Sequence, residues 1–456
     1  MPKHGLFLIL LAFISSIAFP AMAADHYIRP AGSTYGSGNG QDWGNACSGF
    51  AGACAVGSMV RGDTYYVAAG TYAGPTFSRA VSGTLLITIK KATVADHGTS
   101  AGWSDALGGG AATLTGGVRF STSYWVLDGQ TGGGPGSWTS GFGFVITQTS
   151  ATPIVELVLN SRAGNITVRH VELSGNRNSN GGGSIAQDAF ALKSSGANFT
   201  VSYYYTHGVG RCPFFCGSTG NPCPGLVAEY GYIGDFVSTS AQHSEVASIS
   251  QMGGDVDFRY NVITAITGTG GLMWDNSANH NAQLRIYGNV FYKGPGAQWD
   301  NNANGIIGSW TSGDGFNIKV YNNTFINVTG ARIFTDFISS GAYGGNEAWN
   351  NLFYNSISPS YANFQSHDYN YYINSGGTHG EAHAQTTPTA DPFANIAALD
   401  FSVVAATNSG LMLPSPLTTD PVGNTRGADG VWDRGAYEFS ASRPAPPTDL
   451  RIDVIQ

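Results

Sequence analysis

A short motif that recurs along the middle of the chain limits the possible folds more than any other feature of the sequence. Each copy begins with a polar or aromatic residue, has Asn at its third position and continues with two or three strand-forming residues. Weaker copies start at Arg169, Ser202 and Glu229. The repeated residues are Asn261, Asn289, Asn323, Asn351 and Asn370, so successive copies are 28, 34, 28 and 19 residues apart. Strand-like segments that repeat every 20 to 50 residues, roughly, indicate a solenoid or a propeller.

The variable spacing of the motif distinguishes between these two architectures. A propeller blade needs four strands in about 40 residues, which these intervals barely accommodate. A solenoid coil needs about 20 residues and places extra residues in loops on one face. The sequence therefore predicts an all-β parallel β-helix, or β-solenoid, with long loops on one face. The Asn residues would then stack about 4.8 Å apart at an inner turn, each amide bonding to the next. The alternative is that each Asn serves a separate turn.

The composition agrees with a β structure and excludes several classes of protein. Charged residues make up 11% of the 456 residues, and 64 residues are Gly. Ordinary globular chains have about 25% charged residues and about 7% Gly. The scarcity of Lys and Glu argues against a helical bundle, and the Gly residues lack the three-residue period of collagen. The net charge of −8 argues against a nucleic-acid partner, which would require a basic surface.

The first 23 residues have the pattern of an export signal. Lys3 and His4 precede an apolar stretch from Leu6 to Phe19, and Ala21-Met22-Ala23 gives a small-x-small cleavage site. We expect residues 1–23 to be a signal peptide and the mature protein to be secreted, to the extracellular space or the periplasm. The alternative is a retained N-terminal anchor. No later segment approaches the apolar length of about 18 residues that a membrane span requires, so we expect no span in the mature chain.

Five Cys residues fit an oxidising compartment. Cys47 and Cys54 bracket a short Gly/Ala loop, which favours a local disulfide. Cys212, Cys216 and Cys223 lie in a Pro/Gly-rich stretch, where two could pair and one would be left over. A zinc site is the weaker interpretation of this trio, because the paired CxxC spacing is missing.

Two segments resemble a known superfamily. Gly62–Tyr72 (GDTYYVAAGTY) resembles the opening coil of right-handed parallel β-helix proteins of the pectate-lyase-like superfamily, and Asp420–Glu438 resembles their closing segment. The resemblance spans roughly residues 26 to 439 and implies one right-handed single-stranded β-helix domain over residues 24–440, followed by a Pro-rich tail over 441–456. The superfamily includes chondroitinase- and alginate-lyase-type enzymes, hydrolases, esterases, epimerases and adhesins, so the resemblance implies the fold more strongly than the activity.

A groove can be placed by aligning the strands that precede the repeated Asn. Equivalent positions on successive coils form flat columns. Polar residues recur in one such column, which predicts a binding groove; the alternative is an ordinary solvated face. The column contains Lys193, Ser248, Asp275, Ser309 and Asp336. The groove is expected on the coils between residues 188 and 340.

Three Trp residues in the same region are candidates for stacking on sugar rings. Each is near a carboxylate, and an indole beside hydrogen-bonding groups suits a sugar with its C–H faces and hydroxyl rim. The alternative is that these Trp residues cap the apolar interior. The three are Trp274, Trp299 and Trp310, near Asp275, Asp300 and Asp314.

Two short segments carry candidate proton-transfer groups. His243 and Glu245 lie two residues apart, which places both on one face of a strand, and Arg259 follows in the next strand. His207 and Arg211 form a second candidate edge before the Cys-rich stretch. The alternative for each pair is a structural hydrogen bond.

These residues together indicate an enzyme acting on polysaccharide. Cleaving a uronate polymer by β-elimination requires a cation near the substrate carboxylate, a base and an acid. Arg259 would neutralise the substrate carboxylate, and His243 would transfer the proton. Glu245 would orient the His243 ring, and Lys193 is an alternative base. Hard oxygen ligands favour calcium as a cofactor, and nucleotide-binding motifs are absent. The sequence predicts a secreted lyase of an acidic glycan; the alternatives are a glycoside hydrolase using Asp275 and Asp336, and a non-catalytic carbohydrate-binding surface protein.

Overall fold

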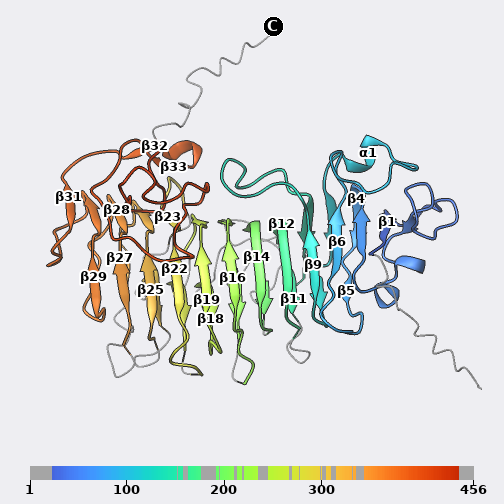
Figure 1. Cartoon of the computed structure of the whole chain (residues 1–456), viewed down its shortest axis with the longest axis horizontal. Coiled ribbons are helices and arrows are strands. Elements are labelled where there is room, and N and C mark those ends of the chain that lie inside the picture. The colour runs from blue at the N-terminus through green and yellow to red at the C-terminus, as the bar shows by residue number, and fades with distance from the viewer. Residues whose placement is uncertain are drawn as a thin grey trace, which may run out of the picture.

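The structure of the protein is a computed structural model. It describes residues 23–150, 152–157, 163–175, 192–194, 196–209, 213–217, 220–234, 245–266, 270–276, 278–297, 299, 305–309, 315–330, 332–334 and 344–440. The predicted signal peptide up to Met22 and the tail over residues 441–456 lie outside this part. Short strands stand side by side along the long axis of the molecule, with the N-terminal coils at one end and the C-terminal coils at the other (Figure 1).

The strands form one 23-stranded sheet and one eight-stranded sheet. The larger sheet bends at a corner and covers two sides of each coil, which we call face I and face II. Its pairings are parallel throughout, so the chain winds in successive coils. Face I consists of β1 (Asp25–Arg29), β3 (Thr64–Val67), β6 (Ile87–Lys91), β9 (Trp125–Asp128), the first half of β12 (Ile166–Ser174), the first half of β14 (Phe199–His207), β16 (Leu226–Glu229), β19 (Val256–Arg259), β22 (Leu284–Tyr287), β25 (Ile318–Tyr321), β27 (Glu347–Trp349) and β29 (Ser366–Asp368).

Face II follows face I in every coil, and β2 (Cys47–Ser48) pairs beside β1. It consists of β4 (Gly70–Ala73), β7 (Ala112–Thr115), β10 (Phe144–Thr147), the second halves of β12 and β14, β17 (Tyr232–Ile233), β20 (Val262–Ile263), β23 (Val290–Tyr292), β26 (Thr324–Ile326), β28 (Leu352–Tyr354), β30 (Tyr371–Ile373) and β31 (Gln385–Thr387).

Face III is the eight-stranded sheet and closes the coil. It consists of β5 (Thr76–Phe77), β8 (Val118–Phe120), β11 (Val155–Leu157), β13 (Leu192–Ser194), β15 (Phe214–Cys216), β18 (Glu245–Ile249), β21 (Gly270–Trp274) and β24 (Ile307–Ser309). The pairings along this face are parallel too. The predicted fold class, a parallel β-helix, is confirmed.

Helical structure is limited to single turns among the described residues. They are α1 (Asp105–Gly108) and three 3-10 turns at Gly52–Cys54, Val56–Ser58 and Ile396–Ala398. In this described part of the chain, no helix combines the length and the apolar composition needed to cross a membrane.

The repeated motif forms the corner between face I and face II rather than one strand. In the copy at Arg259, the face I strand ends at Arg259, Tyr260 turns the chain with φ of 58°, and the face II strand starts at Val262. Asn261 lies between the turn residue and β20, with its side chain fully buried. The weaker copies have the same geometry, because His170, Tyr203 and Tyr230 also have positive φ.

The five repeated Asn residues form a continuous hydrogen-bonded row, as the sequence predicts. Nδ2 of each of the first four donates to Oδ1 of the Asn in the next coil, at distances of 3.0, 3.0, 3.1 and 3.0 Å. The backbone N–H of each donor Asn bonds to that same oxygen. Every amide is therefore satisfied inside the coil, where an unpaired polar group would be costly. Beside the row, the rings of Phe291, Phe325, Phe353 and Tyr372 stack at centroid distances of 4.9 to 5.3 Å.

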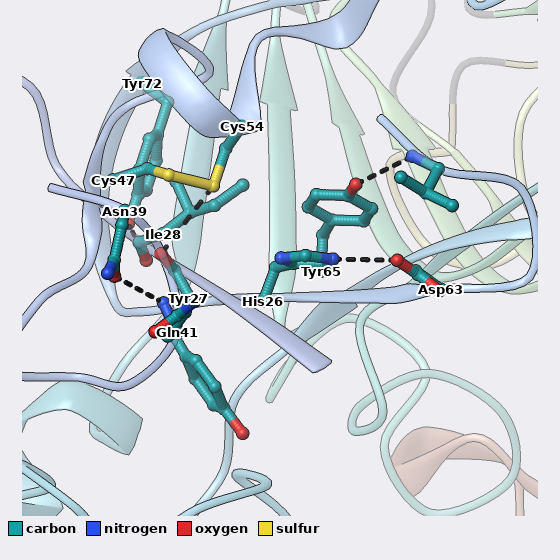
Figure 2. The surroundings of a disulfide bond; sticks show 11 residues. His26, Tyr27, Ile28, Asn39, Gln41, Cys47, Cys54, Asp63, Tyr65 and Tyr72 are labelled. Atoms are coloured by element: carbon teal, nitrogen blue, oxygen red, sulfur yellow. Dashed lines mark hydrogen bonds and ion pairs between the residues drawn. A yellow bond between two sulfur atoms is a disulfide. The ribbon is translucent and has the colours of Figure 1, made fainter. Parts of the chain in front are cut away.

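Two disulfides are present among the described residues. Cys47 pairs with Cys54, as predicted, and Cys216 pairs with Cys223. Cys212 lies outside the described residues. Figure 2 shows the first bond next to Ile28 and Tyr72 in the opening coil. The second links the end of β15 to the connection that leads to β16, so it staples a single coil.

The C-terminal segment leaves the last coil and packs against the outside of the stack. The antiparallel strands β32 (Phe393–Asn395) and β33 (Asp400–Val403) contribute Phe393 and Phe401 to an apolar cluster with outward residues of face II. Residues further along reach the corner, where the side chain of Asn322 bonds to the backbone oxygen of Asp433 at 2.9 Å. The described segment ends at Ser440.

Candidate functional site

A cleft of about 410 Å³ lies on the outside of face II, over the middle coils. Its volume falls within the range of small-ligand sites, about 300 to 1,000 Å³. The floor comes from outward positions of β14, β17 and β23 and from the residues that follow β20. The lining residues are Tyr205, Tyr232, Gly234, Thr264, Ala265, Tyr292 and Gly294–Ala297.

The strand register explains why these residues meet. Tyr205 pairs with Tyr232, and Ile263 of the next coil pairs with Phe291, which places Thr264 beside Tyr292. Successive coils are about 4.8 Å apart, so side chains from four coils form one continuous surface. The rings of Tyr205 and Tyr232 make an edge contact at a centroid distance of 5.5 Å.

Gly234 keeps the floor of the cleft open. A Cβ atom at this position would lie 2.7 Å from Oγ1 of Thr264 and 2.8 Å from Cε1 of Tyr232. Both distances are shorter than van der Waals contact, so any side chain here would displace the two residues or fill the space between them. A glycine is therefore required by the close approach of neighbouring coils.

A histidine and a carboxylate lie at the edge of the cleft. Nε2 of His207 is 2.9 Å from Oε1 of Glu172 on the preceding coil. The His207 ring stacks on Tyr205 at a centroid distance of 4.3 Å, and His207 neighbours Gly234 in the strand register. The ring is held by a hydrogen bond and by stacking, and 22% of its side chain is exposed.

Two segments that are far apart in the sequence border the cleft. Phe142, in the loop between β9 and β10, packs near Tyr205, and Trp138 of that loop joins the apolar cluster on face II. Phe401 of β33 contacts Tyr292 edge-on at 5.5 Å. Figure 1 shows this loop and the β32–β33 hairpin on the same side of the coil stack. Burial raises the pKa of Tyr292 above its ordinary value, so its hydroxyl stays protonated at neutral pH.

Arg259 lies on face I, around the corner from the cleft. Its Nε is 2.6 Å from Oε2 of Glu229, and its Nη1 donates to the hydroxyl of Tyr287 at 2.5 Å. These contacts follow from the register, because Glu229, Arg259 and Tyr287 are direct neighbours on successive strands. Burial acts to lower the pKa of Arg259, but Tyr287 and Glu229 outweigh it and raise that pKa. Arg259 therefore stabilises face I as an ion pair.

Lys193 and Glu245 lie on face III, so the candidate groups are distributed over three faces. Lys193 belongs to β13, although its side chain lies outside what the structure describes. Glu245 starts β18 on the same side of the strand as Ala247 and Ile249, which face the core, and it is fully buried. Its expected partner His243 lies outside the described residues.

The predicted polar column differs from the observed register. Lys193 pairs with Phe215, Phe215 with Ser248, and Ser248 with Met273. Asp275 is therefore two residues beyond the expected position, and Ser309 pairs with Trp274 instead. The predicted column is out of register for two reasons. β15 lies in the Cys-rich stretch, where the sequence does not indicate a strand. In addition, polarity alone does not fix the register between strands of unequal length.

The described Trp candidates are part of the core. Trp274 is fully buried and Trp299 is 9% exposed, and both belong to the main apolar cluster. Their rings pack inside the coil instead of presenting a face to solvent. Asp275 is half-buried at the end of β21. Trp310, Asp336 and Arg211 lie outside the described residues, as do Asp300 and Asp314.

A calcium ion is the cofactor expected from the sequence. Calcium requires several oxygen ligands around one point. No group of three or more Asp, Glu, His or Cys side chains is placed to hold a metal ion within the described ranges. Asp255 and Asp257, the nearest acidic pair to Arg259 in sequence, are instead held by Arg285 at 3.0 and 2.5 Å.

The cleft residues could have been found from the repeat itself. In every copy of the motif, the fourth position is the first outward position of face II. In the three weaker copies that position is Glu172, Tyr205 and Tyr232, and in the five strong copies it is Val262, Val290, Thr324, Leu352 and Tyr371. The weaker copies thus supply cleft residues at this position, although residue type alone does not mark the site, because Thr324 and Tyr371 are also polar or aromatic.

The chain is similar to several solved structures at low sequence identity. No protein-family model matches the chain, and no curated protein matches it. It is similar to the pectate lyase Pel9A, with 14% identity over 92% of this chain and 97% of that chain and a TM-score of 0.44. It is also similar to the PL6 family polysaccharide lyase Pedsa3628 from Pseudopedobacter saltans, with 12% identity over 80% of this chain and 95% of that chain and a TM-score of 0.33.

A third similar structure is the PL6 family alginate lyase AlyGC, with 13% identity over 80% of this chain and 53% of that chain and a TM-score of 0.34. At these values the likeness has no bearing on the activity of this chain. The parallel registers of the three faces, together with the stacked Asn row, are sufficient to define the architecture. By its fold, the protein is a parallel β-helix protein.

Proposed function

We propose that the protein is a secreted enzyme that binds an acidic polysaccharide in the face II cleft and cleaves it by β-elimination. The observation that carries this proposal is the His207–Glu172 pair at the edge of a cleft lined by three tyrosines. Tyrosine rings supply apolar surface for the C–H faces of sugars, and their hydroxyls bond to the sugar rim. An imidazole held by a carboxylate is suited to proton transfer near neutral pH.

In this proposal each group has its own step. Glu172 holds Nε2 of His207, so Nδ1 is the nitrogen that takes the proton from the carbon next to the uronate carboxylate. The electron pair of that C–H bond forms the new carbon–carbon double bond, and the glycosidic oxygen leaves and gains a proton from the imidazolium or from water. Lys293 follows Tyr292 directly in the chain, and its Nζ donates to the backbone oxygen of Thr329 at 2.9 Å. It is the cation proposed to offset the substrate carboxylate.

The activity test uses a panel of polyuronates and neutral glycans. β-Elimination gives an unsaturated product that absorbs in the ultraviolet, and this signal is the expected result with at least one polyuronate. New reducing ends without the absorbance would replace the lyase with a glycoside hydrolase. Retained binding without either product would leave a carbohydrate-binding protein.

The site is tested by comparing two histidines. His207→Ala should reduce turnover about 10²-fold or more, the scale of a lost acid–base group. His383→Ala is the matched control, because Nδ1 of His383 is 2.7 Å from Asp368 in a similar imidazole–carboxylate pair far from the cleft. If both variants keep the turnover of the unmodified protein, His207 has no part in the chemistry.

A further inference from the structure

The first residue expected after signal removal is held by a nearly buried carboxylate. The backbone nitrogen of Ala24 lies 3.0 Å from Oδ1 of Asp63, and Asp63 is 6% exposed. Thr64 N–H donates to the backbone oxygen of Ala24, also at 3.0 Å. Both polar backbone groups of Ala24 are therefore bound to the segment that begins β3.

The Asp63 carboxylate is fixed in position by a second partner. Nε2 of His26 is 2.8 Å from Oδ2 of Asp63, and the His26 ring stacks on Tyr65 at a centroid distance of 4.5 Å. Figure 2 shows the His26 ring below the ring of Tyr65, with a dashed line from His26 to the carboxylate of Asp63. One carboxylate oxygen is thus held by the imidazole, while the other is directed at the Ala24 nitrogen.

An independent feature of the sequence points to the same atom. Ala21-Met22-Ala23 has the small-x-small pattern after which export signals are cut. Cleavage there would make the Ala24 nitrogen the amino terminus of the mature chain. Ala24 is therefore both the first residue after the predicted cleavage site and the residue whose nitrogen contacts Asp63.

We propose that the peptide bond between Ala23 and Ala24 is a processing site and that the α-ammonium group it releases forms an ion pair with Asp63. In the hydrolysis a signal peptidase directs water to the Ala23 carbonyl carbon and the C–N bond breaks. Ala23 leaves as a carboxylate, and the Ala24 nitrogen takes up protons to become an ammonium. The proposal does not depend on the activity of the face II cleft.

The ion pair would complete the first coil. Before cleavage the Ala24 nitrogen is an uncharged amide that offers one N–H to the Asp63 carboxylate. After cleavage it carries a full positive charge, so the attraction between two opposite charges is added to the hydrogen bond. The first residues of a domain fray unless something holds them. The ammonium would anchor the start of β1 at the open end of the coil stack, where no earlier coil packs against it in the described chain.

The experiment compares exported proteins that differ at the amino terminus and at residue 63. The full chain with its signal is expressed for export, alone and with Gly-Ser inserted between Ala23 and Ala24, so that Ala24 becomes an amide again. Each form is made with Asp63 and with Asp63→Asn. Asp25→Asn is the matched control, because it removes an exposed carboxylate one residue from Ala24.

The first result to examine is the N-terminal sequence of the exported protein, which should begin at Ala24; a different first residue would overturn the proposal. The second is the melting temperature. The Gly-Ser insertion should lower it by about 1–2 °C in the otherwise unmodified protein and in the Asp25→Asn variant, and leave it unchanged in the Asp63→Asn variant. If the insertion lowers melting equally with and without the Asp63→Asn substitution, the ammonium and Asp63 are not paired.

Discussion

Asn370 donates two hydrogen bonds to the Glu381 carboxylate, from Nδ2 to Oε1 at 2.8 Å and from its backbone N–H to Oε2 at 3.0 Å. This contact ends the row of stacked Asn residues. In every pair of the row, Nδ2 points toward the later coil, so the amide dipoles are aligned and the carboxylate meets their positive end. At the other end, the Tyr204 hydroxyl donates to Oδ1 of Asn261 at 2.8 Å.

Replacing an Asn in the middle of the row should destabilise the fold. Asn323→Leu removes the Nδ2 donor to Oδ1 of Asn351, which keeps only the backbone N–H of residue 323, and it leaves both Asn289 donors without their acceptor. We expect a loss of about 1–3 kcal/mol in the free energy of unfolding. Asn408→Leu, at an exposed position, is the control. Urea denaturation followed by circular dichroism measures both. Equal stability of the two variants would show that the row contributes nothing.

The Glu381 contact should make stability depend on acid pH. Burial acts to raise the pKa of Glu381, but hydrogen bonds from His367, Tyr372 and Asn370 outweigh it and lower that pKa. A carboxyl with a lowered folded-state pKa contributes stability above its unfolded pKa of about 4.5 and loses that contribution as pH falls through the folded value. The melting temperature of Glu381→Gln should therefore fall less than that of the unmodified protein between about pH 6 and pH 3.

The control for this pH series is Asp391→Asn, which removes an exposed carboxylate. Its acid profile should follow that of the unmodified protein. An identical profile for Glu381→Gln would contradict the assigned role of Glu381 at the end of the row.

The cleft should respond to changes in its floor without loss of the fold. Tyr232→Ala removes a ring that lines the cleft, and Gly234→Ala fills the space between Tyr232 and Thr264. Each should weaken polysaccharide binding about tenfold or more, the scale of one lost or blocked stacking contact. Affinity electrophoresis measures the change. Val404→Ala, on an exposed side chain, is the control. Unchanged binding by both cleft variants would place the glycan elsewhere.

Arg259 should matter for stability rather than for turnover. Arg259→Ala leaves Glu229, whose side chain is 15% exposed, without its cation, so we expect a loss of about 1–3 kcal/mol in unfolding free energy. Lys90→Ala is the control, because the side chain of its partner Asp96 is 38% exposed and keeps its hydrogen bond from the Tyr66 hydroxyl. That loss should stay below about 1 kcal/mol. Reduced turnover with unchanged melting in Arg259→Ala would return Arg259 to the catalytic groups.

The fold could be predicted from the sequence because its determinants are local and repeated. The Asn motif places an amide at the same corner of each coil, and each copy gives the same turn, so five copies reinforce one interpretation. The disulfide between Cys47 and Cys54 could also be predicted from the sequence, since both residues border one short loop. Face III was harder to align, because its strands lack a marker residue and β15 is hidden among Cys, Pro and Gly residues.

The site was less predictable, because a cleft on a solenoid joins residues from different coils. His207 was identified as a candidate, but its partner Glu172 is 35 residues earlier and becomes a neighbour only through the register of β12 and β14. Trp274 has the kind of side chain that stacks on sugar rings, but it lies in the core. Side-chain type alone does not distinguish these two roles. They are distinguished by the side of β21 on which the residue lies.

The contact between Tyr260 and Thr419 spans 159 residues of sequence at 3.0 Å. Most other contacts in the stack join one coil to the next, so each coil can pack on the preceding one without the C-terminal segment. The C-terminal segment contacts several coils at once and follows them in the chain. Until it arrives, the corner at Tyr260, Asn322 and Asn350 lacks the partners that it has in the finished molecule. Assembly would therefore proceed coil by coil, and the C-terminal segment would lock a stack that is already wound.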